Sequence, residues 1–143
     1  MSNKQTELVV GLIVWRFSCD PTEISGILQL VPSSTAKKGV PSAHGRPPAG
    51  VNNWWLASDA HPADLSLASH VRSLMAKVAK NIANFANLPT DAEVCLRCGI
   101  SDYGHKPELL LGLPELRWLV DIDASLDIDY YIFSRGEVKR RRD

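Results

Sequence analysis

Apolar and polar positions along the chain predict four strands. The run over residues 7–17 is apolar on both faces, as in a central strand that is covered on both sides. Runs over residues 52–58 and 92–100 predict two further strands. A fourth strand begins near Ser125, where apolar and polar side chains alternate up to Phe133.

The last of these strands is expected to have one buried face and one solvated face. Its apolar side chains fall on alternate positions, Leu126, Ile128, Tyr130 and Ile132. Asp127 and Asp129 fall on the opposite face. The alternation therefore predicts that the apolar set packs into the core and that both carboxylates contact water.

Three helical segments lie between the strands. Asp20 can cap a helix that has Pro21 at its first position, and Pro32 ends this helix. The longest segment, residues 62–87, keeps apolar side chains at helical spacing and is amphipathic. A third helix opens at Pro114, and we expect three of its side chains to face inward, Leu116, Leu119 and Val120.

The order of these segments predicts the fold class. Strands and helices follow one another along the chain, so we expect an α+β fold. The sheet is expected to be a single mixed layer of about four strands that carries three helices. The longest helix is expected to pack across this sheet or to bend, and residues 1–143 are expected to form a single domain.

Two segments lie outside this pattern. Residues 33–50 are rich in proline and glycine and show no hydrophobic periodicity, which predicts a long loop. Residues 135–143 contain the run KRRR and are expected to form a basic, solvated tail.

Composition and charge then narrow the classes of partner. Hydrophobic residues make up 45% of the chain and charged residues 22%, as in soluble globular proteins. Lys plus Arg and Asp plus Glu both number 16, so no net field attracts nucleic acid or a membrane surface. The apolar run over residues 8–15 is too short to span a bilayer and has no cleavage site after it. We therefore expect a cytoplasmic protein with no membrane partner and no nucleic acid.

Metal and thiol chemistry find little support in the sequence. Cys95 and Cys98 have the spacing of a redox or zinc pair, but strand periodicity points them to opposite faces. The aspartates between Asp121 and Asp129 fail as a calcium loop, because Leu126 stands where a glycine must make the turn. We expect no metal and no cofactor.

Asp127 and Asp129 leave two interpretations open. Their Cα atoms lie about 7 Å apart on one strand face, which only loosely suits an acid–base pair. The simpler interpretation is a solvated face whose charges discourage edge-to-edge pairing of strands.

Several segments together resemble a bacterial family known as domain of unknown function 4279. They include the capped helix DPTEISGILQLVP, the KKG followed by an arginine, and the pattern of Trp54, Leu56 and Ser58. The long amphipathic helix and the closing SLDIDYY complete the resemblance, which spans about Val9 to Phe133.

The resemblance implies a small cytoplasmic bacterial domain, and it carries over six positions as a candidate binding site, Lys38, Gly39, Arg46, Trp54, Asp127 and Asp129. Each has a simpler structural role. Gly39 suits a turn with positive φ, and Trp54 suits a core anchor. Lys38 and Arg46 suit a solvated loop, although with the backbone amides near Gly39 they could hold an anion.

Two functions follow as hypotheses. The first is a non-catalytic protein-interaction module, a class that includes immunity proteins against toxins. The alternative is a binder or hydrolase of a small anionic ligand, in which Lys38 and Arg46 hold the anion and Asp127 or Asp129 acts as the base. Whether the chain is an enzyme stays open, with the non-catalytic function preferred.

Overall fold

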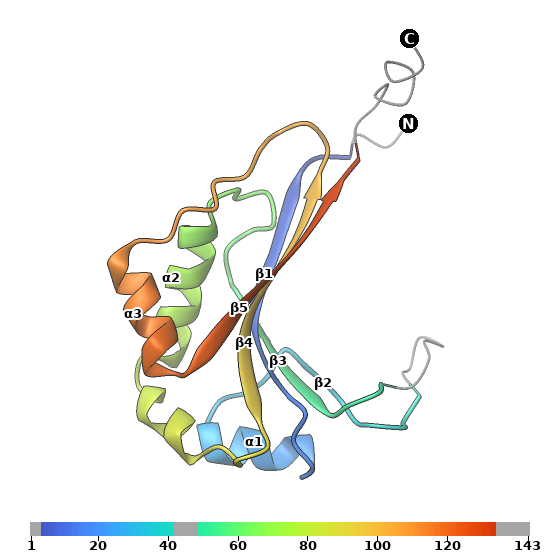
Figure 1. The fold of residues 1–143 in the computed structure, drawn as a ribbon, viewed down its shortest axis with the longest axis vertical. Helices are drawn as coiled ribbons and strands as arrows, with labels where there is room; N and C mark the ends of the chain where they lie inside the picture. Colours follow the sequence, from blue (N-terminus) through green and yellow to red (C-terminus); the bar gives the residue numbers. More distant parts are fainter. Residues whose placement is uncertain (1–3, 42–48, 134–143) are drawn as a thin grey trace.

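One mixed β-sheet forms the frame of the computed structural model, which describes residues 4–41 and 49–133 (Figure 1). The described residues form five strands, β1 (Glu7–Trp15), β2 (Ser34–Ala36), β3 (Asn53–Ala57), β4 (Glu93–Asp102) and β5 (Ala124–Ile132). They lie in the order β2-β3-β1-β4-β5. All neighbouring pairs are antiparallel except β4 and β5, which are parallel.

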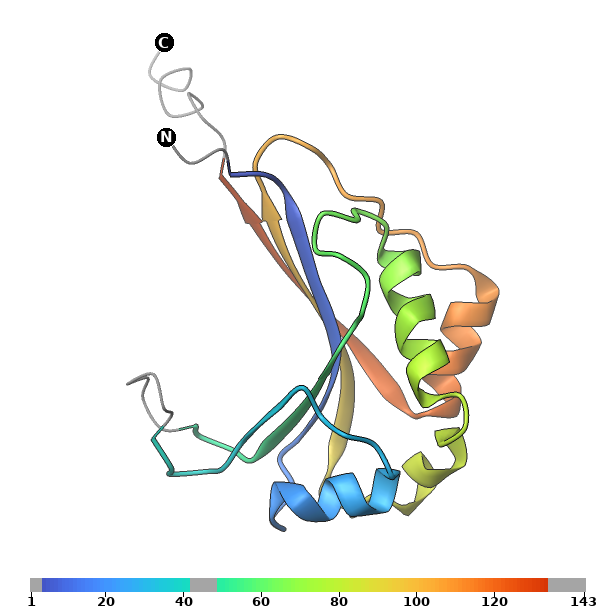
Figure 2. The same ribbon diagram turned by 180° about the vertical axis from the view of Figure 1, so that it is seen from behind.

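Within the described residues, four helices lie on one side of this sheet and leave the other side without a helix (Figures 1 and 2). They are α1 (Pro21–Leu28), α2 (Leu67–Val78), the 3-10 helix η1 (Ile82–Asn87) and α3 (Leu113–Asp121). We call the side with the helices the helix face and the other side the open face. The α+β class and the single mixed sheet are as the sequence predicts.

The core lies between the central strands and the helices. Even-numbered side chains of β1 point to the helix face, and four of them are buried, Leu8, Val10, Leu12 and Val14. Trp54 of β3 is fully buried on the same face and donates its indole N–H to Ser25 Oγ of α1 at 3.0 Å. This bond satisfies the one polar atom that Trp54 brings into the core.

The open face of β1 is covered by neighbouring side chains rather than by a second layer. Ile13 is in register with Trp55 and Cys95 and is buried. The ring of Trp55 lies over Gly11, where a Cβ atom would come within 2.5 Å of the ring. The double-sided apolar pattern of this strand therefore reflects a sheet whose own aromatic side chains shield its centre.

The segment predicted as one long helix over residues 62–87 consists of two shorter helices, α2 and η1, with a break between them. The chain leaves helical geometry at Asn81, whose φ is −121° and ψ is 8°. This break places two amides against the last turn of α1. Asn81 Nδ2 donates to the Gln29 carbonyl at 2.7 Å, and Asn84 Nδ2 donates to the Leu28 carbonyl at 3.1 Å. Both bonds satisfy carbonyls that a helix end leaves without partners.

The predicted loop over residues 33–50 contains a fifth strand, β2, which the sequence did not indicate. β2 has only three residues and pairs with β3 at the edge of the sheet. Residues 42–48, which include Arg46, and residues 134–143, which include the basic run, lie outside the described part of the chain.

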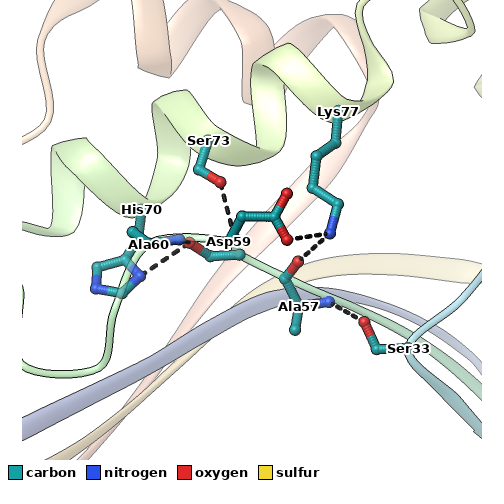
Figure 3. A network of polar contacts seen from close by, with 8 residues as sticks. Ser33, Ala57, Asp59, Ala60, His70, Ser73 and Lys77 are labelled. Atoms are coloured by element: carbon teal, nitrogen blue, oxygen red, sulfur yellow. Dashed lines mark hydrogen bonds and ion pairs between the residues drawn. The ribbon is translucent and has the colours of Figure 1, made fainter.

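Polar contacts tie the end of β3 to α2 (Figure 3). Lys77 Nζ donates to the Ala57 carbonyl and to Asp59 Oδ1, both at 2.9 Å. Ser73 Oγ accepts the Asp59 amide at 2.8 Å. These bonds hold α2 across the sheet, as expected for the longest helix. Among the described residues, no helix has both the length and the apolar character needed to cross a bilayer.

We expect Gly11→Ala to destabilise the fold by about 1–3 kcal/mol, because the new Cβ would overlap the Trp55 ring and the Leu56 carbonyl oxygen. Gly99→Ala is the matched control on the same face, where the nearest atom, the Val9 carbonyl oxygen, lies 3.9 Å away. Gly99→Ala should be neutral or stabilising by up to about 1 kcal/mol. Urea unfolding of both variants measures the difference, and equal effects would contradict the packing of Trp55 over Gly11.

Candidate functional site

Exposed large hydrophobic side chains concentrate in the last part of the described chain. Of fourteen such side chains, eleven lie between Leu109 and Phe133, and the other three are scattered over the first 40 residues. Scattered exposed hydrophobics are ordinary, whereas a concentration of them marks an interaction surface. α3 and β5, which carry most of this concentration, therefore form the candidate site.

The buried face predicted for β5 is wrong. Its four alternate apolar side chains do point to the helix face, in register with buried residues of β4, but they are 38–65% exposed, Leu126, Ile128, Tyr130 and Ile132. β5 lies at the edge of the sheet, and its upper part extends beyond the helices (Figure 1). The helix layer therefore does not cover this strand.

The inward face predicted for α3 is also partly wrong. Leu119 is buried as expected, but Leu116 is 43% exposed and Val120 is 77% exposed. The side of α3 that packs into the protein carries Glu115 and Trp118 instead, and Glu115 Oε1 lies 3.6 Å from Arg72 Nη1. The helix has a second apolar stripe at positions i, i+3 and i+7, formed by Leu113, Leu116 and Val120.

The backbone of β5 presents hydrogen-bonding groups along its outer edge. Phe133, directly after the strand, donates its amide to the Asp102 carbonyl of β4 at 2.7 Å. Backbone groups of a strand point alternately to its two sides, so the odd-numbered residues of β5 bond to β4. The even-numbered residues point their N–H and C=O groups away from the sheet, Leu126, Ile128, Tyr130 and Ile132. We call these backbone groups, with the same four side chains, the β5 edge.

The two aspartates of β5 lie on the open face and have different neighbours. Asp127 is in register with Arg97, and its Oδ2 lies 3.4 Å from Arg97 Nε, close enough for attraction between the charges. The Arg97 guanidinium also lies 5.0 Å from the centre of the Trp15 ring, which holds it in place. Asp129 is in register with Gly99, which has no side chain to offer it. Asp129 is exposed, so its charge is directed at solvent.

One polar contact fixes the upper end of β5 to β4. Tyr130 Oη donates to Asp102 Oδ2 at 2.7 Å, and Asp102 Oδ1 accepts the Gly104 amide at 2.8 Å. These bonds, first from Gly104 and then from Tyr130, hold the pKa of the Asp102 carboxyl below its ordinary value. The bond to Asp102 in turn raises the pKa of the Tyr130 hydroxyl.

The structure does not bring together the five predicted site residues that it describes, and the sixth, Arg46, lies outside the described residues. Lys38 and Gly39 follow β2 at one edge of the sheet, and Asp127 and Asp129 lie on β5 at the other edge, roughly 19 Å away by strand spacing. Gly39 has φ +77°, as its role in a turn predicts. Trp54 is fully buried on the helix face, as a core anchor is.

A cleft of about 710 Å³ opens where η1, β4 and β5 meet. Its walls include Trp15 and three carboxylates, Glu93, Asp121 and Asp123, and no lysine, arginine or histidine among the described residues. Asp121 ends α3, and Asp123 turns the chain into β5 with φ +55°. Arg16 balances Glu93 at 3.1 Å, whereas no described ion pair balances Asp121 or Asp123, so the cleft disfavours an anion and does not supply the anion site of the alternative function.

A serine and a histidine also lie in contact at the end of β3. His70 is buried on α2, and its Nε2 lies 2.8 Å from the Asp64 carbonyl oxygen, which can only accept. When the ring is neutral, its Nδ1 accepts from the Ser58 hydroxyl, 3.0 Å away. Ser58 Oγ accepts in turn from the Ala60 amide at 3.0 Å. Every polar side-chain atom of this pair therefore has a partner within the fold, and the pair serves as a structural contact between the end of β3 and α2.

The cysteines and acidic residues form no metal site within residues 4–41 and 49–133, where no three His, Cys, Asp or Glu side chains gather around one point. Cys95 and Cys98 point to opposite faces of β4, as predicted, and both are buried. Burial raises the pKa of the Cys98 thiol to about 11, so it stays protonated and unreactive at neutral pH.

Proline substitutions test which amides face outward. Ile128→Pro removes an amide of the β5 edge, whereas Asp129→Pro removes an amide that bonds to β4. We expect Asp129→Pro to cost about 1–3 kcal/mol more stability than Ile128→Pro in urea unfolding. Asp129→Ala serves as the control for loss of the charge. Equal losses for the two prolines would show that the strand is oriented differently.

The contact between Tyr130 and Asp102 predicts a pH dependence. Because the folded pKa of Asp102 is lowered, its stabilisation is fully present above the ordinary value of about 3.9 and is lost as pH falls through the folded value. Because the folded pKa of Tyr130 is raised, its contribution is lost as pH rises through that value. Tyr130→Phe should therefore lower the melting temperature most between about pH 4 and pH 10.

Tyr131→Phe is the matched control, because it removes the same hydroxyl group from a side chain on the open face of the same strand. Its melting temperature should follow that of the wild type at every pH. A Tyr130→Phe deficit that does not change with pH would rule out the ionised Asp102 as its cause.

The sequence pattern identified the four side chains of the β5 edge as one face of a strand but did not indicate that this face is exposed. The second apolar stripe of α3 was a usable signal, because a nine-residue helix with apolar side chains on two faces cannot bury both. The exposure of β5 had no such signal, because strand alternation is the same at an edge as in the centre of a sheet.

Comparison with known proteins identifies the family and adds no function. A family model described as Domain of unknown function (DUF4279) matches residues 5–133, nearly the whole chain. No curated protein and no solved structure matches the chain. The resemblance seen in the capped helix, the tryptophan motif and the closing strand is confirmed, and the chain belongs to the DUF4279 family.

Proposed function

We propose that this protein is a non-catalytic interaction module that binds a partner protein by adding a strand of the partner to the β5 edge. The observation that carries the proposal is the exposure of an edge strand of nine residues with four apolar side chains on one face. Edge strands of this length and composition pair readily with other chains and are usually shielded. Strand addition uses backbone hydrogen bonds for affinity and side chains for specificity.

The surface around the β5 edge supports the same function. The second stripe of α3 comes from the helix that leads directly into β5, and it adds exposed apolar side chains on the helix side of the sheet. Burying such side chains contributes roughly 25 cal/mol per Å² of apolar area. β5 contains neither a proline nor a lysine, two of the residues that commonly protect an edge from pairing.

The alternative function, a binder or hydrolase of a small anion, has weaker support. Its cationic residue Lys38 and its proposed bases Asp127 and Asp129 lie at opposite edges of the sheet. The described cleft is lined with carboxylates, which repel an anionic ligand. The interaction module is therefore the function that we put to the test.

Ile128→Lys should weaken binding of a partner without unfolding the protein, because it places a charge in the middle of the β5 edge at a position that is already 38% exposed. We expect a partner captured with the wild-type protein to bind this variant at least about tenfold more weakly. Titration calorimetry with the purified partner measures the effect, and hydrogen exchange should show protection of the β5 amides in the complex.

Val31→Lys is the control, because Val31 is also an exposed apolar side chain and follows α1 far from β5 in the fold. It should bind the partner as the wild type does. A partner that loses no affinity with Ile128→Lys would contradict binding at the β5 edge.

A toxin is one class of partner that we include in this proposal, since immunity proteins are small stand-alone interaction domains. The test is to produce the protein together with a toxin encoded beside its own gene. Growth that the wild-type protein restores and Ile128→Lys does not would support this class. Equal growth with and without the protein would exclude it for that toxin.

A further inference from the structure

We infer that the strand that binds the β5 edge alternates apolar residues with lysine or arginine, and that its basic side chains lie beside Asp129 and Asp127. This inference rests on the proposed function and names the chemistry of the partner. An added strand continues the two faces of the sheet, so its alternate side chains lie next to those of β5. On the helix face they contact the apolar side chains of the β5 edge, and on the open face they contact the two aspartates.

Asp129 favours a basic partner more strongly than Asp127 does. Its neighbour on the inner side is Gly99, so β4 provides no side chain to balance its charge. Asp127 differs, because Arg97 lies 3.4 Å from its carboxylate and already provides a positive charge. A cation beside Asp129 therefore has to come from the outer side, where the partner strand lies. Opposite charges directly across two strands stabilise the pairing, and like charges destabilise it.

The same aspartates disfavour a second copy of this chain as the occupant. A closed dimer that joins two β5 edges needs an antiparallel pairing about a two-fold axis. Pairing all nine residues of β5 places Asp127 of each copy opposite Asp129 of the other. Shifting the pairing by two residues in either direction leaves seven pairs. One shift places Asp127 opposite Asp127 of the other copy, and the other shift places Asp129 opposite Asp129. Every extensive pairing therefore sets carboxylate against carboxylate.

The position of these residues in the ladder makes the repulsion stronger. The even-numbered residues supply the outward backbone groups, so they form the hydrogen-bonded pairs with an added antiparallel strand. The aspartates then occupy the non-hydrogen-bonded pairs, where facing Cα atoms lie only about 4.5 Å apart. The same closeness favours a lysine or arginine at those positions of a partner.

Two short synthetic peptides with blocked ends test the inference, one of alternating valine and lysine and one of alternating valine and glutamate. The probe is the full chain, and the readout is hydrogen exchange of the β5 amides by NMR over a peptide titration. We expect the lysine peptide to protect the amides of the β5 edge, and the glutamate peptide to leave them unprotected, Leu126, Ile128, Tyr130 and Ile132.

Charge reversal adds a second readout. Asp129→Lys should weaken binding of the lysine peptide about tenfold and let the glutamate peptide bind. Asp127→Lys should have a smaller effect, because Arg97 already offsets Asp127. Glu7→Lys is the control, since Glu7 lies on the open face of β1, two strands away from β5. It should leave both affinities unchanged.

The outcomes separate this inference from the proposed function. Equal protection by both peptides would overturn the basic partner and keep strand addition. No protection by either peptide would overturn strand addition at β5 itself. Protection that rises with the concentration of the protein alone, with a dimer in sedimentation, would overturn both the basic partner and the argument against a second copy.

Discussion

The parallel pairing of β5 with β4 is the constraint on which the surface of this protein depends. A strand that returns parallel to its neighbour needs a crossover, and here α3 makes that crossover from the helix side. The crossover ends at Asp121, and the chain turns through Ile122 and Asp123 directly into the edge position. Because no described strand lies beyond β5, its outward backbone groups and its apolar side chains reach the surface together.

The centre of the sheet shows how the rest of the fold is stabilised. β1 has neighbours on both sides, and its even-numbered side chains contact the helix layer. On the open face, where no helix lies, the rings of Trp55 and Trp15 shield the strands in place of a second layer. The polar contacts at the ends of α1 and α2, from Asn81, Asn84 and Lys77, then fix the helices over this sheet. Helices and aromatic side chains therefore cover the centre of the sheet and leave the side chains of β5 partly exposed.

Because β5 is exposed at the edge of the sheet, its acidic residues influence which strands can pair with it. Edges that are protected against pairing commonly carry lysine or proline, whereas Asp127 and Asp129 repel acidic strands, including the same strand of a second copy. Arg97 and Gly99 make the two aspartates unequal, so the surface distinguishes one position from the other. Specificity of this kind combines an attractive contact with a repulsive one.

The sequence by itself determined the strands of the core, the cap of α1, the opposite faces of Cys95 and Cys98, and the family. These features depend on local periodicity and on residues close together in the chain. Only the tertiary structure decided the order of the strands, and with it that β5 lies at an edge. Alternation shows which side chains share a face, but burial of that face depends on whether another element covers it, and the sequence pattern of β5 is the same in both cases. The break at Asn81 also depends on the tertiary structure, because Asn81 bonds to the Gln29 carbonyl at the end of α1, fifty-two residues earlier in the chain.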